Sequence, residues 1–143
     1  MDKILLEVVG TQRIDSQKDK MELTTIATIE ELEDHYKIRY TEEYEAPVKP
    51  VDVCVKIGKD EKSVEMTRTG DFSSRLVIEK SQRNLCHYGT EYGDILMGIS
   101  GHTIDCDYNE NGGSFLFSYD IDINGALASK NEVRLTFRKN QEQ

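Results

Sequence analysis

The stretch Phe115-Leu-Phe-Ser-Tyr-Asp-Ile-Asp-Ile123 alternates between apolar and polar residues along nearly its whole length. Because successive side chains of a β-strand point to opposite faces, this pattern predicts a strand with one buried and one solvated face. A later segment, 132–138, has the same period, and we expect it to pair beside the first. The residues predicted to face the interior are Phe115, Phe117, Tyr119, Ile121, Ile123, Val133, Leu135 and Phe137.

The same two-residue period recurs over most of the chain, with short polar breaks between segments. In segment 23–32, Ile26, Ile29 and Leu32 recur near helical spacing, but the density of β-branched residues favours a strand. Residues 15–20 are predicted to be a solvated connection. The predicted strands are 4–14, 23–32, 36–44, 51–57, 63–69, 73–79, 86–92, 95–100, 103–108, 114–123 and 132–138.

The number of strands and the length of their connections indicate the fold class. About ten short strands with regularly spaced turn signals are typical of a β-sandwich or β-barrel. Connections of hairpin length favour an up-and-down meander over Greek-key crossings. We therefore predict one all-β domain over residues 1–143, folded as a single closed antiparallel up-and-down barrel of about 8–10 strands.

Composition narrows the class of protein. The chain is 37% hydrophobic and 31% charged, as a globular domain is, and its net charge of −9 argues against a nucleic-acid partner. No apolar stretch approaches the ~20 residues of a membrane span, and Glu7 interrupts the apolar start, which argues against a signal peptide. We expect a cytoplasmic protein without a membrane partner. Its three cysteines have no CxxC spacing and are expected to be free, packed thiols that bind no metal.

Two motifs suggest chemistry but favour a simpler explanation. The segment 107–118 matches a calcium-binding loop at its first, third and fifth positions, yet Ser118 stands where the closing glutamate belongs. Asn111-Gly112 is better explained as a hairpin turn. The histidines His35, His87 and His102 have no nucleophile or metal-ligand spacing, and no phosphate-binding loop is present. No catalytic residue, metal or cofactor is therefore predicted.

Glu42 and Arg68 are charged residues that fall in phase with apolar strand faces. Glu42 shares a face with Ile38 and Tyr40, and Arg68 shares one with Met66. A charge inside an apolar barrel needs a partner, so the two residues are expected to contact each other or a ligand. The alternative is that both lie near strand ends, where an inward-facing side chain still reaches water. The sequence leaves these interpretations evenly balanced.

Four motifs in this order resemble the YwiB-like family of small, uncharacterised bacterial proteins, mainly from Gram-positive lineages. They are Tyr36-x-Ile-x-Tyr40-x-Glu42-Glu43, Arg68-x-Gly70, Tyr88-x-Thr90-x-Tyr92-Gly93 and Gly113-x-Phe-Leu-Phe-x-Tyr119. The resemblance spans essentially the whole chain, although the turn before Tyr36 lacks a glycine that is often found there. It implies a calycin-like barrel, akin to lipocalins and fatty-acid-binding proteins. It implies no activity or cofactor, because none is established for the family.

Three functional hypotheses follow. The first is a barrel that binds a small amphipathic or anionic ligand in its interior. The second is a non-catalytic interaction or assembly domain whose barrel is filled by side chains. In either case the protein is expected to be a monomer or a homodimer. An enzyme is the least favoured. An interior cavity of roughly 300 Å³ or more would favour the first hypothesis, and a filled interior the second. The candidate ligand-binding residues are Arg68, Glu42, Tyr36, Tyr40, Tyr88, Tyr92 and Tyr119.

Overall fold

A computed structural model describes residues 2–70, 73–90 and 93–139, without the side chains of 88–90. These residues form an all-β barrel, and none of them forms a helix that is long and apolar enough to cross a membrane. The strands are β1 (Asp2–Ile14), β2 (Gln17–Glu31), β3 (His35–Glu42), β4 (Val51–Gly58), β5 (Ser63–Thr69), β6 (Ser74–Glu79), β7 (Arg83–Thr90), β8 (Gly93–Tyr108), β9 (Gly112–Ile123) and β10 (Ala126–Lys139).

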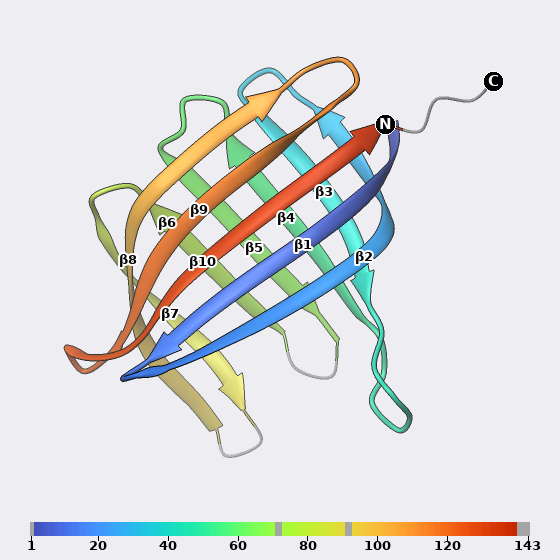
Figure 1. The fold of residues 1–143 in the computed structure, drawn as a ribbon. Coiled ribbons are helices and arrows are strands. Elements are labelled where there is room, and N and C mark those ends of the chain that lie inside the picture. Colours follow the sequence, from blue (N-terminus) through green and yellow to red (C-terminus); the bar gives the residue numbers. More distant parts are fainter. Residues whose placement is uncertain (1, 71–72, 91–92, 140–143) are drawn as a thin grey trace.

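Each strand pairs antiparallel with its neighbour in sequence, and β1 pairs with β10 to close the barrel (Figure 1). The closing ladder aligns Leu6 with Phe137 and Val8 with Leu135, so the apolar phases of the first and last strands meet. The predicted up-and-down barrel is confirmed, and it fits a calycin-like architecture. The connections that follow odd-numbered strands share one end of such a barrel, which we call the lower rim. The opposite end is the upper rim.

Two predicted boundaries were wrong for reasons that involve strand pairing. Segments 95–100 and 103–108 belong to one strand, β8, whose register shifts between Gly101 and Ile104. This irregularity moves the inward-facing positions from odd to even numbers, which the sequence displays as a break. Residues 15–20 were predicted to be a connection, but the β1–β2 ladder continues as far as the pair Ile14 and Gln17. Both faces of that ribbon are exposed, so no alternation reveals it.

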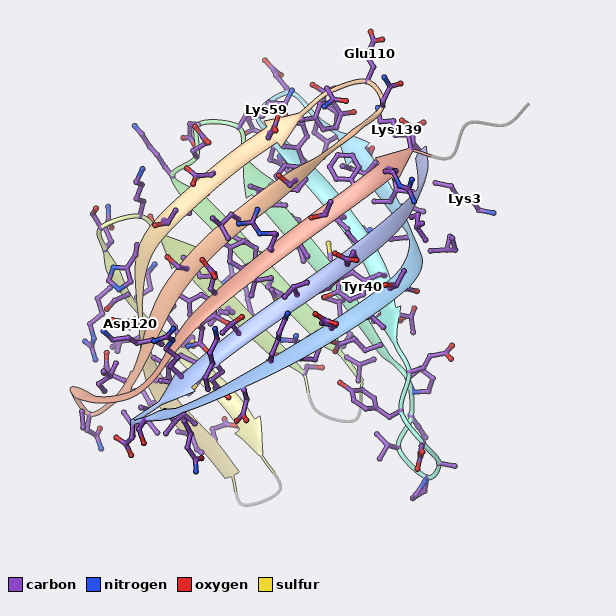
Figure 2. The ribbon with its side chains drawn as sticks, in the orientation of Figure 1. Lys3, Tyr40, Lys59, Glu110, Asp120 and Lys139 are labelled. Atoms are coloured by element: carbon purple, nitrogen blue, oxygen red, sulfur yellow. The ribbon has the colours of Figure 1, made fainter. Side chains whose placement is uncertain are left out.

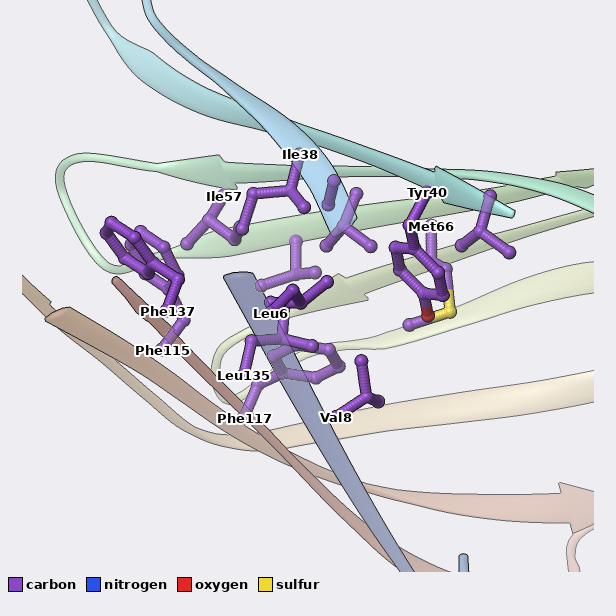
Figure 3. Close-up of a cluster of buried hydrophobic side chains, with 14 of the residues drawn as sticks. Leu6, Val8, Ile38, Tyr40, Ile57, Met66, Phe115, Phe117, Leu135 and Phe137 are labelled. Carbon is purple, nitrogen blue, oxygen red and sulfur yellow. The ribbon is translucent and has the colours of Figure 1, made fainter. Parts of the chain in front are cut away.

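The interior is filled by side chains from most of the strands (Figure 3). Phe115, Phe117, Leu135 and Phe137 are fully buried, as their alternation predicts. Ile121 and Val133 pack against this core while remaining partly exposed. Ile123 is the exception, because it is 41% exposed at the lower rim. It directly precedes the tight turn at Asn124 and Gly125, whose φ angles of 55° and 84° suit these two residue types.

The upper rim is closed by four stacked or tilted aromatic rings. The rings of Tyr36 and Tyr108 have centroids 4.7 Å apart. The ammonium groups of Lys59 and Lys139 lie 5.3 Å and 4.8 Å from the centroids of Tyr36 and Tyr108, respectively. Figure 2 shows both lysines near this end of the molecule. Such cation–π contacts leave the charges in water while they cover the apolar plug. The plug consists of Tyr36, Tyr108, Phe115 and Phe137.

Segment 107–118, which partly matches a calcium-binding loop, contains the β8–β9 hairpin turn, as predicted. The side chain of Asn109 accepts hydrogen bonds from the backbone N–H groups of Asn111 and Gly112, at 2.9 and 3.0 Å. Glycine is required at 112 because a Cβ there would lie 2.4 Å from the carbonyl oxygen of Phe137. Within the part of the chain that the structure describes, no group of three or more His, Cys, Asp or Glu residues is arranged to hold a metal ion.

All three cysteines are free thiols, as predicted. Cys86 and Cys106 pack against the core, and burial, together with nearby acidic residues, raises the pKa of Cys106 to about 11. Cys54 was also expected to be a packed thiol, but it does not join the core. Its neighbours Val53 and Val55 are buried, so Cys54 faces outward from β4.

Candidate functional site

Near the lower rim, the inward-facing positions change from apolar to polar. Glu42 is the last residue of β3, Arg68 is the penultimate residue of β5, and Tyr119 lies in the lower half of β9. Glu42 is buried and Tyr40, one inward position above it, is only 6% exposed. The expectation from strand phase therefore holds for the buried carboxylate of Glu42, whereas the Arg68 side chain lies near its strand end and is 37% exposed, as the alternative interpretation expected.

Glu42 and Arg68 form a two-point ion pair. Nε of Arg68 donates to Oε1 of Glu42 at 3.1 Å, and Nη2 donates to Oε2 at 3.5 Å. The hydroxyl of Tyr44 donates to the same Oε1 at 3.2 Å. The Glu42 side chain is 9% exposed, whereas that of Arg68 is 37% exposed. Burial alone would lower the pKa of Arg68, but the hydrogen bond and charge of Glu42 outweigh it and raise this pKa, so the guanidinium stays charged.

The pair bridges two strands that are not adjacent. Glu42 lies opposite Val51 on β4, and Val53 of β4 lies opposite Arg68 on β5. Two strand spacings separate β3 from β5, roughly 10 Å, so only long side chains can meet across the valines. The same ladder puts Tyr40, Val53, Arg68 and Ser74 in one row across four strands. This row positions the guanidinium beside an apolar wall.

Two phenols flank the guanidinium. Burial, with a contribution from the Glu42 carboxylate, raises the pKa of Tyr40 to about 12. Burial also raises the pKa of Tyr119, against an opposing effect of the Arg68 charge. Neither hydroxyl has a hydrogen-bond partner among the described residues, although every fully buried side-chain N or O atom of these residues has one. Both hydroxyls must therefore be reached by solvent, next to a charged group.

The structure separates one predicted residue from this group. Tyr36 lies six positions from Glu42 along β3, in the aromatic plug of the upper rim, so the structure does not bring this candidate together with Arg68. Tyr92 lies outside the described residues. For Tyr88 only the backbone is described, and it pairs with Ser74 and extends the row of Arg68 to β7.

Sequence phase did not single out two further contributors to this end of the barrel. Ser129 is buried, and Asn131 donates to its hydroxyl at 3.0 Å and to the carbonyl of Tyr119 at 3.5 Å. Both residues precede residue 132, where the last strand was predicted to start, because β10 begins at Ala126. Tyr44 was predicted to end the third strand, but its bond to Glu42 forms from the loop that follows β3.

A large concavity lies outside the barrel wall rather than within it. The strand β2 pairs with β1 up to Ile29, but pairs with β3 only from Thr28 to Glu31. Beyond that point β2 and β3 separate, and a trough of about 1070 Å³ lies along the separation. One wall is β2 from Leu23 to Thr28, and the other is mainly the outer face of β3, β4 and β5, where the inward-facing Tyr40 and Val53 also line the trough.

Comparison with known proteins identifies the family. The model of DUF1934, described as a domain of unknown function, matches residues 6–135. The chain belongs to the DUF1934 family. The crystal structure of the YwiB protein from Bacillus subtilis matches with a TM-score of 0.83 at 18% identity, over 98% of this chain and 93% of that chain. This structural match confirms the resemblance to the YwiB-like family. Because the identity is so low, the match shows a shared fold and nothing about function. None of the curated proteins matches the chain. For this DUF1934 barrel, function must therefore be argued from its own residues.

The raised pKa of Tyr40 gives a test of its burial. Above pH 10 the unfolded tyrosine ionises while the folded one stays protonated, so the folded state binds more protons and stability falls as pH rises towards 12. Tyr40→Phe should remove this loss, which is about 1 kcal/mol at pH 11. Urea unfolding of both proteins at pH 8 and pH 11 measures it. An equal alkaline loss in the two proteins would show that the Tyr40 hydroxyl is fully solvated.

Proposed function

We propose that this barrel is a non-catalytic binding protein for a small anionic ligand with an apolar portion, held at the lower rim. The observation that carries the proposal is the arrangement of Arg68 with two solvent-reached phenols. Nη1 of Arg68 makes no hydrogen bond to any described residue, and the Glu42 pair fixes the orientation of the guanidinium. A carboxylate or phosphate is the natural acceptor for such a preorganised guanidinium.

The roles of the candidate residues follow from their positions. Arg68 would bind the anionic group, and Glu42 would orient Arg68 without contacting the ligand. Tyr40 and Tyr119 would donate their hydroxyls to the same anion. Apolar side chains exposed at the lower rim would contact the rest of the ligand, among them Met21, Tyr44 and Ile123. Tyr88 stays a candidate because its backbone extends the row of Arg68, and Tyr92 stays a candidate from the sequence alone.

The interior is filled by side chains, which by the criterion of cavity volume favours the interaction or assembly domain over a ligand deep in the barrel, so the proposed ligand is confined to the lower rim. Met66 and Phe117 are buried in the core cluster above Arg68, and Figure 3 shows Met66 beside Tyr40 in this cluster. A long acyl chain running the length of the barrel would have to displace these side chains. We therefore propose a ligand whose anionic group occupies the lower rim and whose apolar portion is short, rather than a long-chain fatty acid.

Isothermal titration with phosphate, acetate, hexanoate and palmitate tests this proposal. Hexanoate is expected to bind, and the double variant Tyr40→Phe with Tyr119→Phe is expected to bind it at least tenfold more weakly. Because neither hydroxyl bonds to a described residue, these substitutions break no such hydrogen bond. Tyr108→Phe is the matched control, since that phenol lies in the upper plug and accepts a hydrogen bond from Lys139.

The outcomes separate cleanly. Loss of affinity in the lower-rim double variant, but not in Tyr108→Phe, would support the site. Equal affinity in all three proteins, or no binding of any of the four probes, would overturn it. Tighter binding of palmitate than of hexanoate would contradict the proposed size limit.

We further propose a cytoplasmic location, which suits a protein with three free thiols.

A further inference from the structure

The free edge of β2 carries an inference beyond the small-ligand site. Between Gln17 and Ala27, β2 pairs with β1 on one side and with no described strand on the other. In an antiparallel sheet, every second residue turns its backbone N–H and C=O away from a given neighbour. This stretch therefore presents a row of backbone groups that pair with no described strand, although the carbonyl of Ile26 accepts a hydrogen bond from the Thr25 hydroxyl at 3.4 Å, and the trough lies directly against it.

Only part of this edge is protected against pairing with another chain. From 17 to 22 the edge carries Lys18, Asp19, Lys20 and Glu22, and such charges discourage strand addition. From Leu23 to Ala27 the sequence is Leu-Thr-Thr-Ile-Ala, with no charge and high β-propensity. Ile26 is 62% exposed there. The unprotected part of the edge coincides with the part that lines the trough.

The opposite wall of the trough carries three cations, although the protein is acidic. They are Lys37, Arg39 and Lys56, whereas Lys3 lies on β1 at the β2 side, and within the described residues none of these four has an ion-pair partner within 4 Å. Lys3 points away from the barrel in Figure 2. Three acidic residues line the same wall: Glu65 pairs with Arg75 at 3.0 Å, Asp52 accepts a hydrogen bond from Thr41 at 3.2 Å, and Glu43 has no ion-pair partner within 4 Å among the described residues.

We propose that the trough binds an extended, acidic segment of a partner polypeptide, which adds to β2 as a further strand. Main-chain hydrogen bonds to residues 23–27 would supply affinity, and carboxylates on alternate residues of the segment would contact Arg39 and Lys56. A second copy of this chain is a poorer occupant. Residues 23–27 of its own β2 edge include no acidic residue that could contact Lys37, Arg39 or Lys56.

The probe is a fluorescein-labelled, end-blocked heptapeptide that alternates glutamate with valine. Anisotropy titration is expected to show saturable binding. A second peptide with the same side chains, but with N-methyl groups on alternate residues, loses the backbone donors and should bind at least tenfold more weakly. A lysine–valine peptide should bind as weakly. Equal binding of the first two peptides would overturn strand addition, and equal binding of the glutamate and lysine peptides would overturn the charge assignment.

Matched charge reversals locate the site. Arg39→Glu with Lys56→Glu should weaken binding of the glutamate peptide at least tenfold. The control is Arg134→Glu with Arg138→Glu, which makes the same change in net charge at two exposed positions on β10. If the two double variants lose affinity equally, the effect is one of overall charge and the trough is not the site.

Cys54 gives an independent readout because it lines the trough, whereas the other two thiols pack against the core. Mass spectrometry after brief treatment with iodoacetamide should show modification mainly at Cys54. The glutamate peptide should slow this modification at least fivefold, and the N-methylated peptide should not. Unchanged modification, or a homodimer in light scattering that the peptide fails to dissociate, would overturn the proposal.

Because Tyr119 does not line the trough, Tyr119→Phe should bind the peptide normally, which distinguishes this proposal from the small-ligand site.

Discussion

Replacing Phe117 by alanine is expected to lower the free energy of unfolding by about 3–5 kcal/mol. The ring is fully buried and lies between Ile104 on β8 and Val133 on β10. It also stacks on Tyr119, with ring centroids 6.4 Å apart. Alanine would leave a cavity in the middle of the barrel, because a closed sheet cannot collapse freely around the missing ring.

Urea unfolding with equal m-values measures this loss. The control is Leu127→Ala, because Leu127 is 58% exposed and its truncation should change stability by less than about 0.5 kcal/mol. A loss below about 1 kcal/mol for Phe117→Ala would contradict the burial of the ring. It would also contradict the phase assigned to the stretch from which the fold was predicted.

The fold was predictable because alternation reports directly which face of a strand is buried. That signal fails where both faces share one environment. Residues 15–20 form strand that is solvated on both faces, so their pairing left no pattern. It also fails where a bulge changes the phase, as it does between Gly101 and Ile104. In both places the structure depends on how one strand pairs with its neighbour, and this pairing cannot be read from the sequence of a single segment.

The site was only half predictable for a related reason. Phase places Tyr36, Tyr40 and Glu42 on one face of β3 but says nothing of depth along the barrel. Tyr36 therefore reaches the upper plug while Glu42 reaches the lower rim. Phase indicated that Arg68 points inward, but only the register across β4 brings it to Glu42. The trough was missed altogether, since the separation of β2 from β3 leaves no trace in either strand's own sequence.

The two proposed sites follow from a common cause. A closed barrel satisfies its backbone groups only where neighbouring strands stay paired. At the lower half of this barrel β2 and β3 separate. The one described residue pair of β6 and β7, Ser74 with Tyr88, lies at the lower end, so these two strands separate towards the upper end instead. It is therefore the separation of β2 from β3 that opens the wall beside Tyr40 and forms the trough.

The second large effect concerns the buried ion pair. Arg68→Met is expected to lower the free energy of unfolding by about 3–5 kcal/mol at pH 7. It strands the Glu42 carboxylate, which is only 9% exposed and, among the described residues, keeps just the hydrogen bond from the Tyr44 hydroxyl. Glu42→Gln should cost less, about 1–3 kcal/mol, because the guanidinium it strands is 37% exposed and can be solvated.

The double variant Arg68→Met with Glu42→Gln distinguishes a stranded carboxylate from lost packing, because it removes the carboxylate together with its partner. The double variant should be at least about 1 kcal/mol more stable than the sum of the single losses predicts.

The exposed pair Arg75–Glu65 is the control for this cycle. Its N–O distance of 3.0 Å is similar to that of the buried pair, but the Arg75 side chain is 67% exposed. Arg75→Met should therefore cost less than about 1 kcal/mol. If Arg68→Met cost no more than Arg75→Met, the lower-rim pair would be an ordinary surface contact. Arg68 would then lack the fixed orientation that makes it a receptor for an anion, because that orientation depends on the Glu42 bond being strong enough to hold the guanidinium against solvent.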